Sequence, residues 1–335
     1  MAMKNTKKHV VAAAMRNEGP FILEWVAWYK SVGFDDVLVA TNDCSDHSVE
    51  LLKALETAGW VHHVEHVPPP ERSAKYSAHR ALRAHPSVDA ADWLFVCDVD
   101  EFLVLHADDG TVQGFLGDEE PDVHGIAFHW KCFGTSGHQY WQDGLVHRQF
   151  TMAAPEQSET NIFFKSLIHR PAHFRQLREH RPQGFLGETW GEVPNVWVNG
   201  DGAVLPKFDP SNNQFQYTRH TRITHANAQV NHYIVRAAES FDLKRGRLDP
   251  TAGKNRHTDR FFNKFNRNDE LDETAMTHAA RFEDVFLRVC ETPGALRLHH
   301  LCCADYVVQL CAKRGDDPKQ DARFVHHMAM AETLK

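Results

Sequence analysis

Residues 93–105 read WLFVCDVDEFLVL, and this stretch decides the fold because three carboxylates interrupt an otherwise apolar run. The carboxylates belong to Asp98, Asp100 and Glu101. The apolar residues before them, Trp93 to Cys97, predict a buried strand. Burying a charge without a partner costs on the order of several kcal/mol, so the sequence predicts a cationic group beside these side chains.

The residues before this stretch alternate between short apolar runs and amphipathic segments. Strands are expected at 9–15, 36–41, 60–67 and 93–97, with helices at 20–32, 45–58 and 71–84. Such alternation is typical of right-handed crossovers in a mostly parallel sheet. Further strands are expected at 124–130 and 161–170, and helices predominate after residue 232. The sequence therefore predicts an α/β fold, a mostly parallel sheet flanked by helices, with a helical C-terminal extension.

Composition limits the classes of function. The chain has 335 residues, of which 42% are hydrophobic and 24% charged, enough for one large domain with an extension. Its formal charge of -8 argues against a nucleic-acid surface or a polybasic membrane anchor. We expect no nucleic-acid partner, while peripheral contact with a membrane surface and the oligomeric state stay open.

The cysteines and histidines give no motif. Seven cysteines, none in a CxxC pair, indicate neither a disulfide framework nor a zinc cage. The 24 histidines are expected to be surface or satisfied core residues unless a neighbourhood singles one out. No apolar run approaches the roughly 20 residues that a spanning helix needs, and the N-terminus resembles a first strand more than a signal peptide. We therefore expect a cytoplasmic protein without a transmembrane segment.

Polar residues follow three of the expected strands. In parallel sheets ligands bind beyond the carboxyl ends of the strands, so these residues are expected to share one crevice. Asp98 and Asp100 offer hard oxygen ligands, which suit Mg²⁺ or Mn²⁺ bridging to a diphosphate. The three groups are Arg16, Asn17 and Glu18; Asn42, Asp43 and Asp46; and Asp98, Asp100 and Glu101.

Several segments together resemble the nucleotide-sugar glycosyltransferases of the GT-A (Rossmann-like) fold, and more closely a family 2-like bacterial group related to family 92. They are MRNEGPFILEWVAWYKSVGF, TNDCSDHS, DWLFVCDVDEFL, WKCFGTSGH followed by DGLV, and NHYIVRAAESFDLKRG. The resemblance implies a GT-A domain over residues 1–270, with a nucleotide-sugar half at about 1–110 and an acceptor half at about 111–270. Residues 271–335 would form the helical extension.

The resemblance also implies roles for the residues at the strand ends. The donor would be a nucleotide sugar, with a UDP-sugar favoured, and the cofactor Mn²⁺ or Mg²⁺. Asp98 and Asp100 match the metal motif, Asp98 also lies near the ribose, and Glu101 would orient a ligand or the donor sugar. His232 would add a metal or diphosphate contact and Lys244 would neutralise the diphosphate. The nucleoside contacts would come from Arg16, Asn17, Glu18, Asn42 and Asp43.

The acceptor, a glycan or glycolipid hydroxyl, is expected near the glycine-rich loop that follows residue 130. Trp130, His138 and Trp141 flank this loop, and aromatic faces stack well on sugar rings. Core packing explains Trp130 equally well, whereas Trp141 lies among polar residues in the sequence. An inverting enzyme needs a carboxylate base. Glu188 and Glu192 are the first candidates and Asp143 the second, but a retaining enzyme would need none, so the stereochemistry stays open.

Two other functions remain alternatives. A nucleotidyltransferase also binds Mg²⁺ through carboxylates, but it usually carries a glycine-rich basic loop after its first strand. Here that position reads MRNEGP, with one glycine and an acidic residue. A carbohydrate-binding protein without activity would leave the aspartates unexplained.

Overall fold

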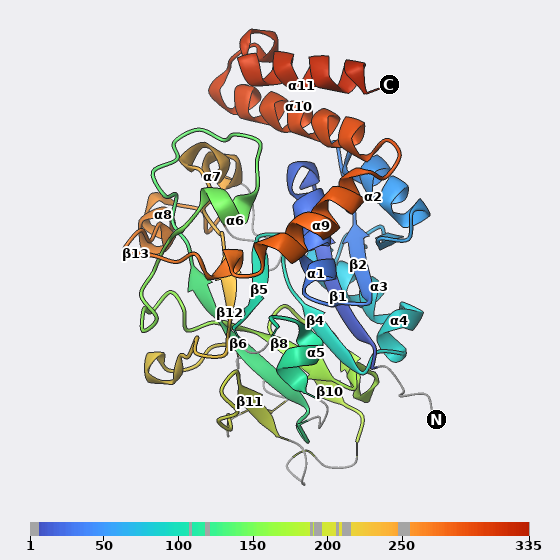
Figure 1. Ribbon diagram of the computed structural model, residues 1–335, viewed down its shortest axis with the longest axis vertical. Coiled ribbons are helices and arrows are strands. Elements are labelled where there is room, and N and C mark those ends of the chain that lie inside the picture. The colour runs from blue at the N-terminus through green and yellow to red at the C-terminus, as the bar shows by residue number, and fades with distance from the viewer. Residues whose placement is uncertain are drawn as a thin grey trace.

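The computed structural model describes residues 7–106, 109–117, 121–187, 190, 196–205, 208–209, 216–246 and 255–334. A sheet with helices on its faces forms the body of the molecule, and a pair of long helices lies at one end (Figure 1). The strands are β1 (His9–Met15), β2 (Asp36–Thr41), β3 (His62–Glu65), β4 (Trp93–Val96), β5 (Glu101–Leu105), β6 (Gly125–Cys132), β7 (Met152–Ala153), β8 (Phe164–His169), β9 (Phe174–Gln176), β10 (Gln183–Phe185), β11 (Trp197–Asn199), β12 (Ala228–His232) and β13 (Glu270–Leu271).

Helices connect the first strands and dominate the end of the chain. They are α1 (Ile22–Ser31), α2 (Ser48–Thr57), α3 (Ala74–Arg83), α4 (Pro86–Asp89), α5 (Val112–Leu116), α6 (Val146–Gln149), α7 (Ala238–Lys244), α8 (Asp259–Phe265), α9 (Ala279–Cys290), α10 (Ala295–Arg314) and α11 (Ala322–Thr333).

The main sheet has the order β3-β2-β1-β4-β8-β6-β12-β5, with β11 paired to β6. The first four strands are parallel, as the alternating pattern predicts. β8 then runs antiparallel to both β4 and β6, and β12 is parallel to β6 but antiparallel to β5. The predicted fold class, α/β with a mostly parallel sheet and a helical C-terminal extension, is confirmed.

Polar residues rarely interrupt the apolar runs of β1 and β2, because both faces of the sheet are covered. In β1, Val11 and Ala13 face the larger core cluster, with Trp25 and Tyr29 of α1. Val10 and Ala12 face the second cluster, which includes Leu82 of α3. The parallel strands therefore end at one edge, which places the loops after β1, β2 and β4 side by side.

The stretch at 93–105 forms two strands rather than one. β4 ends at Val96 and β5 begins at Glu101, so Asp98 and Asp100 lie in the intervening turn. The Glu101 amide donates to the Asp98 carbonyl at 3.1 Å, which closes this turn. The two aspartates follow the end of β4, as the sequence predicts, and the chain bends at this turn, where β5 leaves the parallel half to pair with β12.

The C-terminal helices pack on the body through α1, α2 and α7. The Phe282 ring of α9 lies 5.7 Å from the Trp28 ring of α1. α10 and α11 lie against each other (Figure 1). Arg323 of α11 donates to the Trp141 carbonyl and to the Glu239 carboxylate, both at 2.7 Å, which ties the helix pair to the loop after β6. Within the described residues, no helix is long and apolar enough to cross a membrane.

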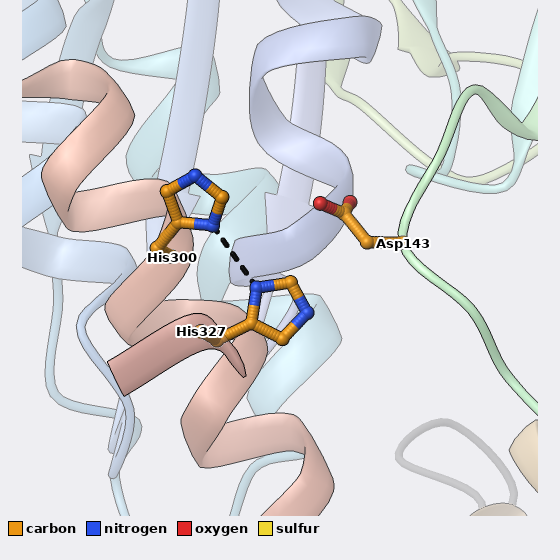
Figure 2. A group of neighbouring side chains, drawn as sticks. All are labelled: Asp143, His300 and His327. Atoms are coloured by element: carbon orange, nitrogen blue, oxygen red, sulfur yellow. Dashed lines mark hydrogen bonds between the residues drawn. The ribbon is translucent and has the colours of Figure 1, made fainter. Parts of the chain in front are cut away.

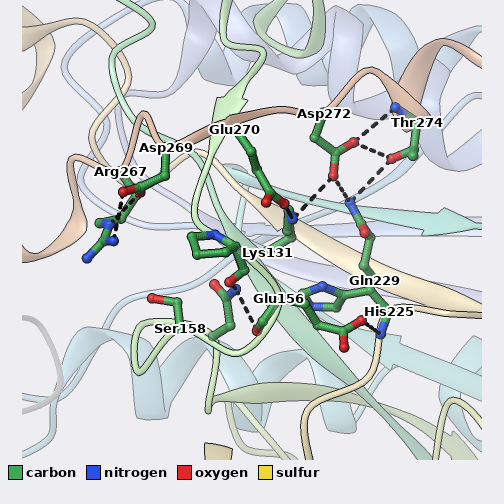
Figure 3. A network of polar contacts seen from close by, with 12 residues as sticks. Lys131, Glu156, Ser158, His225, Gln229, Arg267, Asp269, Glu270, Asp272 and Thr274 are labelled. Carbon is green, nitrogen blue, oxygen red and sulfur yellow. Dashed lines mark hydrogen bonds and ion pairs between the residues drawn. The ribbon is translucent and has the colours of Figure 1, made fainter.

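A polar network fastens the segment that leads into these helices (Figure 3). Lys131 of β6 is paired with Glu270, and it lies 3.8 Å from Asp272. Gln229 of β12 donates to Asp272 at 3.0 Å and to Thr274 at 3.3 Å. Because these partners come from central strands, the segment at 270–274 is held to the sheet before α9 begins.

Candidate active site

The turn between β4 and β5 carries the first part of the candidate site. Asp98 accepts from Lys75 of α3 at 2.8 Å and from Lys165 of β8 at 3.2 Å. Lys165 also lies 2.9 Å from Glu101, and its side chain and that of Glu101 are 1% and 0% exposed. Lys75 contacts Glu179 as well, at 2.8 Å. The cationic group that the sequence requires beside these carboxylates is therefore present in the form of two lysines.

Asp100 faces a different set of partners. Lys244 of α7 lies 3.2 Å from its carboxylate, and Nε2 of His232 lies 3.7 Å away. Lys244 also donates to the Ile234 carbonyl at 2.9 Å, which fixes its ammonium group. The two aspartates of the motif therefore diverge, with Asp98 held from the α3 and β8 side and Asp100 from the β12 and α7 side.

The ionisation states follow from burial and these pairs. Burial opposes charge on both aspartates, but Lys165 and Lys75 hold the pKa of Asp98 well below its ordinary value, and Lys244 and His232 lower the pKa of Asp100. Burial raises the pKa of Glu101 to about 7 despite Lys165. Burial also lowers the pKa of His232 to about 3, so its imidazole is neutral at pH 7. The turn therefore presents two carboxylates beside a neutral imidazole.

The residues predicted to surround the nucleoside lie at the adjoining strand ends. Arg16 donates through Nε to the Asp43 carbonyl at 3.2 Å, and Asn17 exchanges two hydrogen bonds with Ser45, at 2.8 and 2.9 Å. Asn42 donates to the Asp43 carboxylate at 2.8 Å. Asn17 and Asp43 have φ values of 56° and 47°. The loops after β1 and β2 are thus joined to each other.

Glu18 is paired with a residue that sequence reasoning did not select. Its carboxylate lies 3.2 Å from Arg236, whose guanidinium carbon lies 3.5 Å from the Phe21 ring centroid. Burial raises the pKa of Glu18. Glu18 therefore forms a partly buried ion pair with Arg236 at this edge of the sheet.

The structure places the predicted substrate-contacting rings mostly in the core. Trp130 is 8% exposed, and its ring lies 4.1 Å from the His232 ring. His138 is held by a bond between Nε2 and the Gln149 carbonyl at 3.1 Å. Trp141 is 4% exposed and its ring packs 4.9 Å from that of Tyr306, which leaves little of the ring surface for a sugar to stack on. In the same loop the ring of Tyr140 is 69% exposed.

The carboxylates considered as a base fall into two groups. Glu188 and Glu192 lie outside the described residues. Asp143 lies 3.1 Å from His299 of α10, and although burial opposes its ionisation, His299 lowers its pKa to about 2. A carboxylate with so low a pKa is a weak proton acceptor, which disfavours Asp143 as a general base.

Four buried or half-buried residues at the site were missed by sequence reasoning. Only Lys165 carries a recognisable signal, because it stands alone in the apolar run IFFKSLI. The other three give no local pattern, because their partners are distant in the chain. The missed residues are Lys75, Lys165, Glu179 and Arg236.

The fold and this geometry define an α/β protein with a buried acidic group at the carboxyl edge of a parallel sheet, where proteins of this architecture bind ligands. The family model of glycosyltransferase family 92 matches residues 11–279, most of the chain. The chain belongs to glycosyltransferase family 92. The predicted enzyme class, a glycosyltransferase, and the relation to family 92 are confirmed, whereas the bacterial subgroup stays a prediction.

Individual relatives are more distant. A glycosyltransferase family 92 protein of Oryza sativa subsp. japonica is 26% identical over 173 residues, which cover 49% of this chain and 29% of that protein. The crystal structure of S. aureus TarS 1-349 is 12% identical over 98% of this chain and 92% of that one, with a TM-score of 0.34. The same S. aureus protein in complex with UDP-GlcNAc is 11% identical over 97% of this chain and 92% of that one, with a TM-score of 0.33.

Proposed function

We propose that this chain transfers a sugar from a nucleotide sugar, with a UDP-sugar favoured, to a hydroxyl of a glycan or glycolipid. The observation that carries this proposal is the buried acidic turn at 98–101, which lies at the carboxyl end of β4 inside the segment that matches the family. Buried carboxylates held ionised by lysines are costly to maintain, which supports a role beyond packing.

A divalent cation fits the donor set of this turn. Asp98 and Asp100 are held ionised and His232 is held neutral, and these are the forms that bind a metal. Among the described residues, no three residues at this turn offer ligand atoms that all lie within 4.8 Å of one another. An ion here would therefore take further oxygens from the nucleotide, as Mg²⁺ and Mn²⁺ commonly do. When bound, it would supply a Lewis acid for the diphosphate.

The charge balance of the turn supports the same proposal. Lys75, Lys165, Lys244 and Arg236 are each already paired with a carboxylate. A diphosphate that arrived without a cation would leave its own charge largely unmatched in a buried site. Lys244, 26% exposed, is the best placed of the four to turn toward a departing diphosphate.

The acceptor side is assigned to the loop after β6 and the residues that follow it. Tyr140 offers an exposed ring on which a sugar can stack. If the reaction inverts the anomeric carbon, we assign the base to Glu188 or Glu192, because the pKa of Asp143 is too low for that task.

Calorimetry of UDP binding, with and without Mn²⁺, tests the proposal. We expect Mn²⁺ to tighten UDP binding by at least about tenfold, equivalent to about 1.4 kcal/mol, and Asp98→Asn to remove that difference. Failure of any nucleoside diphosphate to bind with Mn²⁺ or Mg²⁺ would contradict the proposal. Release of pyrophosphate from a nucleoside triphosphate would favour the nucleotidyltransferase alternative.

A further inference from the structure

A second group of potential ligands lies where the C-terminal helices meet the loop after β6. Asp143 comes from the loop, His299, His300 and Cys303 from α10, and His327 from α11. The ligand atoms of Asp143, His300 and His327 all lie within 4.8 Å of one another. Figure 2 shows the two imidazoles facing each other through ring nitrogens, with the Asp143 carboxylate projecting from the loop beside them.

The two imidazoles have an arrangement that a shared ion would explain. Nδ1 of His300 and Nδ1 of His327 are 3.0 Å apart, so only one of them can carry a proton in the contact. Two nitrogens bonded at 2.0–2.1 Å to one tetrahedral zinc ion lie about 3.4 Å apart, so a small movement would admit the ion. His327 is 3% exposed, so its ring is held in place by the packing of α11 against α10.

A neighbouring histidine supports the carboxylate. Nε2 of His299 lies 3.1 and 3.2 Å from the two oxygens of Asp143. Its Nδ1 is buried and has no hydrogen-bond partner among the described residues. Carboxylate ligands of metal ions are commonly oriented by a hydrogen bond of this kind. Asp143 is thus already fixed next to the histidine pair.

The geometry points to a transition-metal site, most suited to Zn²⁺, with Asp143, His300 and His327 as its three protein ligands and water as the fourth. Imidazole nitrogens select Zn²⁺ over Mg²⁺ and Mn²⁺, whereas the oxygen ligands of the acidic turn favour the reverse. Bound here, the ion would join the loop at 139–145 to α10 and α11. It would strengthen the attachment that Arg323 already makes to the Trp141 carbonyl in this loop.

Calorimetry with ZnCl₂ on the untagged full chain, stripped of metal by a chelator, tests the site. We expect one Zn²⁺ per chain at micromolar or tighter affinity and a higher thermal midpoint with Zn²⁺ than without. His327→Ala and Asp143→Asn should each weaken binding by at least about tenfold. His326→Ala is the matched control, because His326 directly precedes His327 on α11 and is exposed. This variant should bind Zn²⁺ as the unaltered chain does.

The visible spectrum of the Co²⁺-loaded chain gives a readout that does not depend on stability. A tetrahedral site of nitrogen and oxygen ligands should give visible ligand-field bands that His300→Gln removes. Equal Zn²⁺ affinity in the unaltered chain and His327→Ala, or an equal loss in His326→Ala, would overturn the proposal. A thiolate-to-cobalt band that Cys303→Ser removes would overturn the assigned ligands, because Asp143, His299 and Cys303 also lie within 4.8 Å of one another.

Discussion

The acidic turn at 98–101 and the Asp143–His300–His327 group differ in which side chains surround their carboxylates. In the turn, carboxylates meet lysines, and every charge has an opposite within 3.2 Å. In the second group one carboxylate lies beside two histidines and, within the described part of the chain, no lysine. Charged oxygen ligands suit a hard ion that arrives with a diphosphate, whereas neutral nitrogens suit a resident transition metal. The two proposed sites would therefore select different metals through their ligands.

The two regions also differ in how they relate to the chain. Asp98, Asp100 and Glu101 fall within four residues, so a local pattern reveals them. Asp143 lies more than 150 residues before His300 in the sequence. Only the packing of α10 and α11 against the loop brings Asp143, His300 and His327 together. The difference teaches that a sequence pattern finds sites built on one turn and misses sites built between elements.

The largest expected effect concerns the lysine beneath the acidic turn. Lys165→Met would leave Glu101 without its buried partner and Asp98 with Lys75 alone. Breaking such a buried pair costs about 3–5 kcal/mol in the free energy of unfolding. Urea unfolding measures this loss. The matched control is Lys53→Met, which removes an exposed pair with Glu65 at 2.7 Å and should leave the free energy of unfolding nearly unchanged, because water and salt screen an exposed pair. Equal effects of the two variants would show that the turn is not held by its charge pairs.

The second prediction separates the two regions by activity. Asp98→Asn should lower the rate of sugar transfer by about 10²-fold or more, because it removes a charge that would face the metal and diphosphate. Asp143→Asn should retain the rate within a few fold, because Asp143 has a pKa of about 2 and faces His299. Initial rates with a saturating donor measure both. Abolished transfer in Asp143→Asn with intact folding would instead assign the base to Asp143.

The third prediction, with the smallest effect, concerns two buried histidines that belong to neither region and the dependence of stability on pH. Burial lowers the pKa of His129 to about 3 and that of His225 to about 4. Between pH 6.5 and those values the unfolded chain binds more protons than the folded one, so stability is full above about pH 6.5 and falls as the pH decreases. Each histidine should contribute up to about 2 kcal/mol of loss between pH 6.5 and 5.

Thermal unfolding between pH 5 and 8 measures this dependence. His129→Gln should make it shallower, because glutamine does not titrate and can keep a bond to Thr218, which His129 contacts at 2.8 Å. His225 lies in the polar network of Figure 3, where its amide donates to Glu156 at 3.0 Å. An unchanged slope in His129→Gln would contradict the contribution assigned to His129.

Much of the fold could be predicted from the sequence where the signals are local. The strand at 9–15 and the strand at 36–41 match β1 and β2 to the residue, and the helices between the first strands begin or end within a few residues of the expected positions. Both strands are covered on two faces, which produces the unbroken apolar runs that make them visible. The sequence does not reveal that β8 pairs antiparallel with β4 or that β12 lies between β6 and β5. Strand pairing depends on residues that are far apart in the sequence.

The sequence by itself determined that carboxylates gather at the carboxyl edge of a parallel sheet, because a buried apolar strand that ends in Asp-x-Asp carries its charges to that edge. Only the tertiary structure decided which cations hold them, that Trp141 is covered, and that Asp143 faces histidines of the C-terminal helices. The physical reason is range: strand burial and turn composition are properties of a few consecutive residues, whereas charge pairing and ligand geometry depend on which distant elements pack together.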